Sequence, residues 1–259
     1  MNVIVLSIGY NSPFDAINKN ILSVQKQCTD SNVIHIVIDD GSIIDISDMV
    51  SKYSDVNFIR NNQKLGAENL LRLNNFIKTP DDIIIILDLH NWFADAYAIQ
   101  TIIEYHKCGI WTTYGSYISS NAVKRRAEYI EMIPESTLKA KRHRVSSWKI
   151  SMPLTFNANL WNNILIDNLK CNNGCYISDG YIIPLFYMLL DLTPYNKVKL
   201  LGDIIAVKNT YYVETICNDI FNDTQLNEID DGKPVINDMF LMLPIKITEK
   251  DIKKYANIS

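Results

Sequence analysis

The sequence predicts an α/β protein with an open, mostly parallel sheet flanked by helices on both faces. Three observations predict it. Short apolar runs alternate along the first half of the chain with segments of helical periodicity. The runs are apolar at nearly every position, which is typical of strands that are covered on both faces. Polar clusters rich in Asp, Asn, Gly and Ser directly follow several of the runs, as expected for loops at the ends of strands.

The expected elements follow one another in a regular order. The strands are predicted at Asn2–Ile8, Val33–Ile38, Val56–Ile59, Ile83–Leu87 and Trp111–Gly115. The segments between them carry apolar residues three or four positions apart, which indicates helices. These helices are predicted at Asp15–Gln27, Ile46–Tyr53, Gly66–Ile77 and Ala94–His106, and a further apolar stretch predicts a buried helix at Asp179–Asp191.

Composition narrows the class of protein. The chain has 259 residues, of which 47% are hydrophobic and 21% charged, as in an ordinary globular protein. Its net charge of -4 argues against a general nucleic-acid binder. The apolar run at the N-terminus is too short to span a membrane and has no signal-peptide cleavage site. We therefore expect a cytoplasmic protein with reduced cysteines, no transmembrane segment and no nucleic-acid partner.

The polar clusters suggest a ligand site. In an open α/β sheet, ligands bind beyond the carboxyl ends of the strands. The clusters expected there are Gly9-Tyr10-Asn11, Asp39-Asp40-Gly41-Ser42, Asn61-Asn62 and Asp88-Leu89-His90-Asn91. They hold more carboxylates and amides than turns require. The sequence has no G-x-G-x-x-G and no Walker A motif, so it predicts neither a dinucleotide site nor a P-loop, and a nucleotidyltransferase is disfavoured.

Taken in order, these clusters resemble glycosyltransferase family 2. Its members are inverting sugar transferases with a Rossmann-like GT-A fold that use nucleotide-sugar donors. The resemblance rests on Tyr10-Asn11, on Asp39-Asp40-Gly41-Ser42, on Asn62 with Gly66 and Asn69, and on Asp88 with His90. It covers residues 1–115 and becomes weaker beyond them, where Ser178-Asp179-Gly180 before an apolar helix still resembles the acceptor half of the family.

The resemblance implies how the chain is organised. Residues 1–259 would form a single GT-A-like domain. Residues 1–115 would be the nucleotide-sugar-binding half, residues 116–210 the acceptor-binding half, and residues 211–259 a C-terminal extension. The donor would be a nucleotide-diphosphate sugar, and the acceptor a hydroxyl of a glycan, lipid or protein.

The resemblance also implies roles for single residues. Tyr10 and Asn11, together with Asp39 and Asp40, would face the base and ribose of the donor, where carboxylates form strong charge-assisted hydrogen bonds. Asn62 and Gly66 belong to the same donor site. Asp88 and His90 would lie at the diphosphate, with a divalent metal between them and the phosphates. Asp179 would be the general base that deprotonates the acceptor hydroxyl, and a single displacement would invert the anomeric carbon.

Several of these residues also fit purely structural roles. Asp39-Asp40-Gly41-Ser42 is a typical turn and cap sequence. Asp88 and Asp179 each precede a predicted helix, so each is also a candidate N-cap. Asp191, at the other end of the helix that follows Asp179, is the second candidate for the base.

His90 decides the expected cofactor, because the family usually has a second carboxylate at this position. Imidazole is a better ligand for Mn²⁺ than for Mg²⁺, so the sequence favours manganese over magnesium. His90 could instead donate a hydrogen bond to a phosphate without any metal. A nucleotide-sugar-binding module that has lost catalysis is the alternative function.

Residues 124–149 form a basic stretch. Its cations are Lys124, Arg125, Arg126, Lys139, Lys141, Arg142, His143, Arg144 and Lys149. Such a run is usually a solvated surface. A diphosphate leaving group nevertheless needs cations, which makes Arg144 a candidate ligand, with Arg142, His143 and Lys149 beside it. Trp148 and Trp161 are expected in the core or as an aromatic platform for the acceptor sugar.

Overall fold

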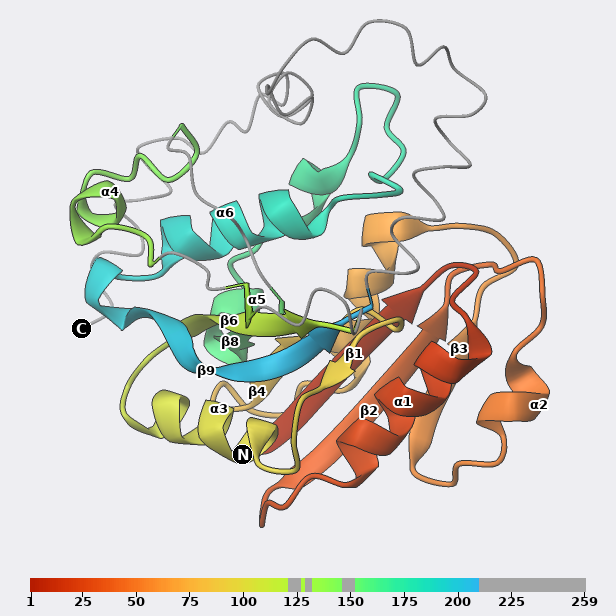
Figure 1. Ribbon diagram of the computed structural model, residues 1–259. Helices are drawn as coiled ribbons and strands as arrows, with labels where there is room; N and C mark the ends of the chain where they lie inside the picture. Colours follow the sequence, from red (N-terminus) through yellow and green to blue (C-terminus); the bar gives the residue numbers. More distant parts are fainter. Residues whose placement is uncertain (121–126, 129–131, 146–151, 210–259) are drawn as a thin grey trace, which may run out of the picture.

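The computed structural model describes residues 1–120, 127–128, 132–145 and 152–209 (Figure 1). Its first half is a parallel sheet, as the sequence predicts. The strands are β1 (Asn2–Gly9), β2 (Asn32–Asp39), β3 (Val56–Arg60) and β4 (Ile83–Ile86). They lie in the order β3-β2-β1-β4, and each neighbouring pair is parallel. Their carboxyl ends therefore lie at one edge.

The second half of the sheet is mixed. The order continues from β4 through β8 (Leu154–Asn157), β6 (Thr112–Ser119) and β9 (Val198–Lys208) to β5 (Trp92–Phe93). β8 is antiparallel to β4 and to β6, β9 is parallel to β6, and β5 is antiparallel to β9. β7 (Ala127–Glu128) pairs with β6, so nine strands of the described residues form one sheet.

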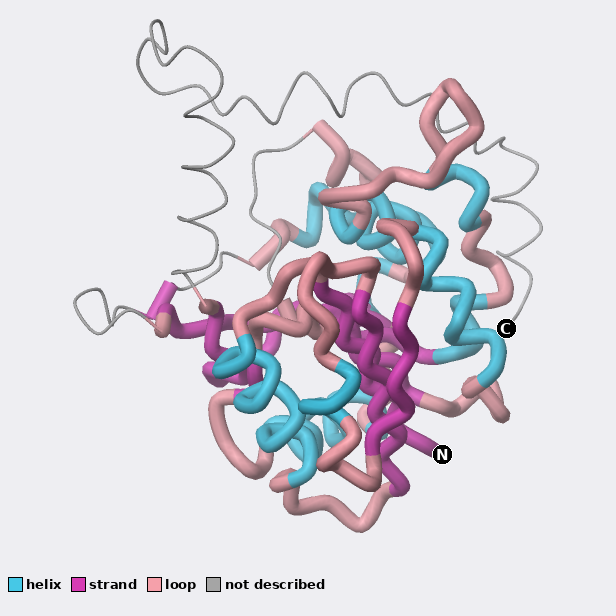
Figure 2. The backbone as a smooth tube through the Cα atoms, turned by 90° about the vertical axis from the view of Figure 1, so that its right-hand side faces the viewer, coloured by secondary structure: helices cyan, strands magenta, loops and turns pink. Residues whose placement is uncertain are grey.

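Helices cover both faces of this sheet, which confirms the predicted fold class (Figure 2). One face carries α1 (Phe14–Gln25), α2 (Ser47–Val50) and α3 (Ala98–Lys107). The other face carries η1 (Gly66–Asn75), α5 (Ala158–Trp161), η3 (Ile166–Leu169) and α6 (Ile182–Leu192).

Strand β1 shows why both faces are buried. Its residues Val3 and Val5 belong to the apolar cluster with α3, whereas Ile4, Leu6 and Ile8 belong to the cluster with η1 and α6. Successive side chains of a strand point to opposite faces, so a run that is apolar throughout supplies both cores.

Two predicted helices begin later than expected. The predicted helix Ala94–His106 starts only at Ala98, because the chain before it pairs with β9 and then turns. The predicted helix Asp179–Asp191 starts at Ile182, with Tyr181 at its N-cap position. Neither Asp88 nor Asp179 therefore caps the helix that follows it.

Part of the chain lies outside the described residues. This part includes the predicted C-terminal extension, residues 211–259, and Lys124, Arg125, Arg126, Trp148 and Lys149 of the basic stretch. In the part that the structure describes, no helix is both long enough and apolar enough to cross a membrane.

Candidate functional site

The polar loops after the first four strands are hydrogen-bonded to one another. Gly9 at the end of β1 lies in register with Asp39, and Asp39 lies in register with Arg60 at the end of β3. The N–H of Asp40 donates to the carbonyl of Gly9 at 2.8 Å, and the N–H of Leu89 donates to the carbonyl of Ile8 at 3.0 Å. The clusters that the sequence places at strand ends therefore meet at one edge of the sheet.

Asp40 holds two of these loops together. Its Oδ1 accepts hydrogen bonds from the side-chain amides of Asn61 and Asn69, at 2.9 and 2.8 Å, and from the N–H of Leu65 at 2.8 Å. Its Oδ2 accepts from the N–H of Gly66 at 3.0 Å. The residue is only 3% exposed. A buried carboxylate with this many donors ties the end of β2 to the start of η1.

Asp39 is buried as well, and it fixes the turn that follows. Its Oδ2 pairs with Nη1 of Arg60 at 2.7 Å, and its Oδ1 accepts from the N–H of Ser42 at 2.9 Å. Gly41 has a φ of +79°, and a Cβ there would lie 2.5 Å from the carbonyl carbon of Gln63. The turn therefore packs against the loop after β3 with no room for a side chain at Gly41.

Asn11 and Asn62 differ in what they contact. Asn11 anchors the same turn, since its N–H donates to Oγ of Ser42 at 2.7 Å and its Oδ1 accepts from the N–H of Ile43 at 2.9 Å. Asn62 is exposed, whereas its neighbour Asn61 is buried against Asp40. The sequence singled out Asn62, and the structure adds Asn61 as the amide that orders this loop.

Gly66 connects the predicted nucleotide-sugar-binding half to the segment that carries Asp179. Its φ is +57°, and a Cβ would lie 2.2 Å from the carbonyl oxygen of Ile177. The N–H of Ala67 donates to this same oxygen at 2.8 Å. Only glycine permits so close an approach in a left-handed conformation. The contact holds the segment of Ser178 and Asp179 at the edge where β1 and β2 end.

A lysine joins two of the predicted site residues. Nζ of Lys64 lies 2.6 and 2.7 Å from the two carboxylate oxygens of Asp179, and 4.8 Å from the ring centroid of Tyr10. Oγ of Ser178 donates to the same carboxylate at 2.9 Å. The Asp179 side chain is 73% exposed, so it is open to solvent as well as to Lys64.

Sequence reasoning missed Lys64. Its partner lies 115 positions further along the chain, so no local pattern marks the pair. The available signal was that Lys64 is the one cation of the loop between Asn61 and Gly66, within the predicted donor site.

Tyr181 is a second residue that sequence reasoning missed. It is buried, and burial raises its pKa well above the ordinary value, with further contributions from the charges of Asp88, Asp40 and Asp179. The phenol therefore stays neutral and can donate a hydrogen bond among these carboxylates. Its aromatic ring made it count as one more apolar residue of the helix, although the charges of three acidic residues act on it.

Asp88 and His90 lie together after β4. Nε2 of His90 is 4.0 Å from Oδ2 of Asp88, and the two side chains are 18% and 34% exposed. Burial lowers the pKa of His90, while the charge of Asp88 raises it and that of Lys208 lowers it further. The imidazole is therefore neutral at pH 7, which is the form that binds metals.

These two residues fit a metal site that is open to other ligands. Nowhere in the described parts of the chain do three or more His, Cys, Asp or Glu side chains gather in a group that could hold a metal ion. Ions such as Mg²⁺ commonly take only one or two protein ligands and complete their shell with phosphate oxygens and water. Asp88 and His90 fit such a site and do not form a closed metal cage.

The predicted ligand Arg144 lies elsewhere. Nη2 of Arg144 pairs with Oδ2 of Asp191, and Nε2 of His143 lies 2.8 Å from its Oδ1. Nζ of Lys141 donates to the carbonyls of Leu190 and Asp191, both at 2.9 Å. This part of the basic stretch, which follows α4 (Glu135–Lys139), therefore binds the C-terminal end of α6 (Figure 1).

Arg144 and Asp191 are thus not brought to Asp179. The helix between Tyr181 and Asp191 is about 15 Å long at its usual rise per residue. Trp161 is 5% exposed, and its Nε1 donates to Oδ1 of Asn74 at 2.6 Å, so it is a core residue. The roles that the sequence gives Arg144 and Asp191 in the donor and acceptor sites stay predictions.

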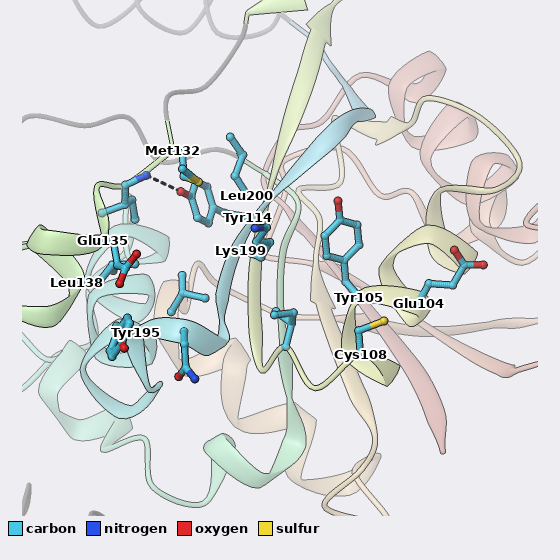
Figure 3. A pocket seen from close by; sticks show the side chains of 14 residues that line it. Glu104, Tyr105, Cys108, Tyr114, Met132, Glu135, Leu138, Tyr195, Lys199 and Leu200 are labelled. Carbon is cyan, nitrogen blue, oxygen red and sulfur yellow. Dashed lines mark hydrogen bonds between the residues drawn. The ribbon is translucent and has the colours of Figure 1, made fainter.

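A large groove lies at the opposite edge of the sheet. It has a volume of about 670 Å³ and is lined by aromatic and apolar side chains that include Tyr105, Tyr114, Leu138 and Tyr195 (Figure 3). It surrounds the beginnings of β6 and β9, and Val198 and Thr112 there lie in register with each other. β6 runs in the same direction as β4, so the groove is far from the strand end that precedes Asp88. None of the predicted site residues lines it.

One protein-family model matches the chain. The model of the family described as glycosyl transferase family 2 matches residues 5–166. No curated protein matches the chain.

The fold is similar to that of S. aureus TarS. A structure of TarS 1-349 superposes with a TM-score of 0.54 at 15% sequence identity, over 93% of this chain and 69% of that one. A structure of TarS 1-349 in complex with UDP-GlcNAc gives 0.52 at 14% identity, over 81% and 59%. The chain spans 42% of a longer TarS structure, with a TM-score of 0.54 and 17% identity. These likenesses confirm the GT-A type of fold.

Proposed function

The chain belongs to glycosyl transferase family 2, and from this premise we propose that it transfers a sugar from a nucleotide-diphosphate sugar to a hydroxyl acceptor with inversion. The observation that carries the proposal is the placement of Asp179. Gly66 packs against Ile177, and Lys64 links the exposed carboxylate of Asp179 to the ring of Tyr10. An exposed carboxylate beside the ligand edge is where a general base must stand to reach an acceptor hydroxyl.

The donor is proposed to lie over the ends of β1 and β4. Tyr10 and Asn11 face its nucleoside, while Asp39 and Asp40 hold the loops at this edge of the sheet. Direct contact of Asp39 and Asp40 with the base and ribose stays a prediction. The similarity in fold to TarS in complex with UDP-GlcNAc supports a nucleotide sugar as donor. The acceptor is a hydroxyl of a glycan, lipid or protein.

Asp88 and His90 are proposed to bind a divalent cation together with the diphosphate. When bound, such an ion neutralises the charge that develops on the leaving nucleotide. The neutral imidazole of His90 supports manganese over magnesium, because nitrogen ligands suit the softer ion. The carboxylate of Asp88 is partly exposed, so it is open to further ligands.

In the reaction, Asp179 is proposed to accept the proton of the acceptor hydroxyl. The hydroxyl oxygen then attacks the anomeric carbon from the face opposite the nucleotide, and the bond to the diphosphate breaks. One displacement of this kind inverts the configuration. Tyr181 is buried and its phenol stays neutral, so it keeps its proton and can donate a hydrogen bond.

Ligand binding tests the first half of the proposal. A thermal-shift panel of nucleoside diphosphates and their sugars, with Mn²⁺, with Mg²⁺ and with neither, should show one nucleotide that stabilises the protein, most strongly with Mn²⁺. A ligand at a hundredfold excess over its dissociation constant adds about 2.7 kcal/mol to the free energy of unfolding. A panel in which no nucleotide shifts the melting temperature contradicts the proposal.

Turnover tests the second half. Asp179→Asn should lower the rate of transfer or donor hydrolysis by about 10²–10⁴-fold while the nucleotide still binds. The alternative is a nucleotide-sugar-binding module without catalysis, which the histidine at the usual carboxylate position favours. Nucleotide binding without turnover under any metal would support that module instead.

A further inference from the structure

The ion pair of Lys64 and Asp179 suggests how binding of the donor changes the contacts of the proposed base. We propose that Lys64 is a positioning residue that exchanges partners: its ammonium holds Asp179 in the free protein and moves to the diphosphate when the donor binds, which releases the base. This inference rests on the proposed function, because it takes Asp179 as the base and a nucleoside diphosphate as part of the donor.

Lys64 and an acceptor hydroxyl compete for the same carboxylate, that of Asp179. The ammonium of Lys64 donates to both carboxylate oxygens, at 2.6 and 2.7 Å, and Ser178 donates to one of them at 2.9 Å. Each of these donors occupies a lone pair that an acceptor hydroxyl would otherwise use. Asp179 is therefore more accessible to an acceptor once Lys64 has left it.

The pair is built to open easily. The side chain of Asp179 is 73% exposed, and exposed ion pairs contribute little to stability. The pair of Arg60 and Asp39 in the same site is the opposite case, because the Asp39 side chain is 0% exposed. A diphosphate carries more negative charge than one carboxylate, so it competes well for an ammonium at an exposed position.

The side chain of Lys64 can move while its backbone stays fixed. The next two residues, Leu65 and Gly66, donate their N–H groups to the buried Asp40. The lysine stem is flexible, and its Nζ already lies 4.8 Å from the ring centroid of Tyr10, on the donor side of Asp179. Arg144, the cation that the sequence suggested for the diphosphate, is held by Asp191 at the other end of α6.

The exchange predicts that removing the base carboxylate improves nucleotide binding. The probes are the nucleoside diphosphate that gives the largest thermal shift among UDP, GDP, ADP, CDP and dTDP, and its parent nucleoside. Asp179→Asn should tighten binding of the diphosphate about two- to fivefold, since Lys64 no longer has to leave a partner. The gain should be smaller in the Lys64→Met background, and the affinity for the nucleoside should not change. Titration calorimetry of the full chain measures all of these affinities.

Asp15→Asn is the matched control for a lost surface charge. Asp15 also pairs with a lysine at 2.6 Å and is 77% exposed, but it lies on α1. This variant should bind the diphosphate as the parent protein does. An equal gain for Asp15→Asn and Asp179→Asn, or an equal gain with and without Lys64, overturns the exchange.

A crystal structure of the nucleoside diphosphate complex gives the direct test. Nζ of Lys64 should lie about 2.7–2.9 Å from a phosphate oxygen and no longer contact Asp179. A bound diphosphate with Lys64 still on Asp179 overturns the inference and leaves the proposed function standing. If none of the nucleotides binds to the folded protein, the proposed function fails, and the inference fails with it.

Discussion

Two carboxylates of the same site, Asp40 and Asp179, are built in opposite ways. Asp40 is 3% exposed and accepts hydrogen bonds from two side-chain amides and two backbone N–H groups. Asp179 is 73% exposed and is held by one lysine and one hydroxyl. Burial with many donors fixes a carboxylate, whereas exposure with one mobile partner leaves it available for chemistry. The contrast separates the frame of the site from the group that we propose as the base, called the reacting group below.

The largest expected effect comes from removing the buried carboxylate. Asp40→Ala should lower the free energy of unfolding by about 3–5 kcal/mol, because it leaves several buried donors unpaired at once. Asp179→Ala should change it by less than about 1 kcal/mol. Denaturant titration of both variants measures the difference. Equal losses would show that the two carboxylates are not divided into frame and reacting group.

The second-largest loss of stability is expected at Gly66, which packs against the segment that carries Asp179. Gly66→Ala is expected to cost about 2–4 kcal/mol, from the left-handed conformation and from the overlap with Ile177 together. Gly109→Ala is the matched control, because Gly109 has a φ of +85° but no atom within 4 Å of an added Cβ. It should lose only about 1 kcal/mol. If both variants lose the same amount, the contact with Ile177 does not hold the Asp179 segment.

Acid should destabilise the fold through two buried histidines. Burial lowers the pKa of His35 to about 3, and burial lowers that of His106 to about 4 despite its hydrogen bond with Asn157. Both groups take up a proton at higher pH in the unfolded chain than in the folded protein. Their contribution to stability is therefore complete above about pH 6.5 and is lost as the pH falls, by about 1.4 kcal/mol per pH unit for each group.

A His35 variant tests how much of this acid sensitivity comes from one residue. His35→Gln keeps a polar side chain near Ser7, whose Oγ lies 3.0 Å from Nε2 of His35, and removes the titration. The free energy of unfolding of this variant, measured from pH 7 to pH 4.5, should fall less steeply than that of the parent protein, by about 1.4 kcal/mol per pH unit. An unchanged slope would place the acid sensitivity in other groups.

The sequence alone predicts the parallel half of the sheet. The four parallel strands could be predicted because each is a short run that is apolar at most positions, and the rule that parallel strands end at one edge brings Tyr10, Asp40 and Asp88 together. In the mixed half, the prediction at Trp111–Gly115 found β6, but β8 and β9 were missed. β8 alternates apolar and polar residues, and β9 carries Lys199, Gly202 and Asp203 within its length, so neither is an apolar run.

The sequence does not show which residues form ion pairs across the site. The pattern could mark Asp179 as a candidate base but could not show that Lys64 binds it, because the two residues become neighbours only when the loop after β3 meets the chain before α6. For the same reason, the basic stretch pointed to a diphosphate, whereas its Lys141 and Arg144 bind the end of α6. Long-range ion pairs depend on packing, and no local spacing encodes them.

The smallest expected effect is also the one that most directly tests the contrast. Lys64→Met should change the free energy of unfolding by at most about 1 kcal/mol, because the pair that it breaks is mostly in solvent. Lys19→Met, which breaks a pair of 2.6 Å on α1, is the matched control and should behave alike. A loss of several kcal/mol for Lys64→Met alone, measured by denaturant unfolding, would mean that Asp179 is locked into the frame as firmly as Asp40. A small loss combined with weakened binding of the nucleoside diphosphate would show that Lys64 acts on the ligand and not on the fold.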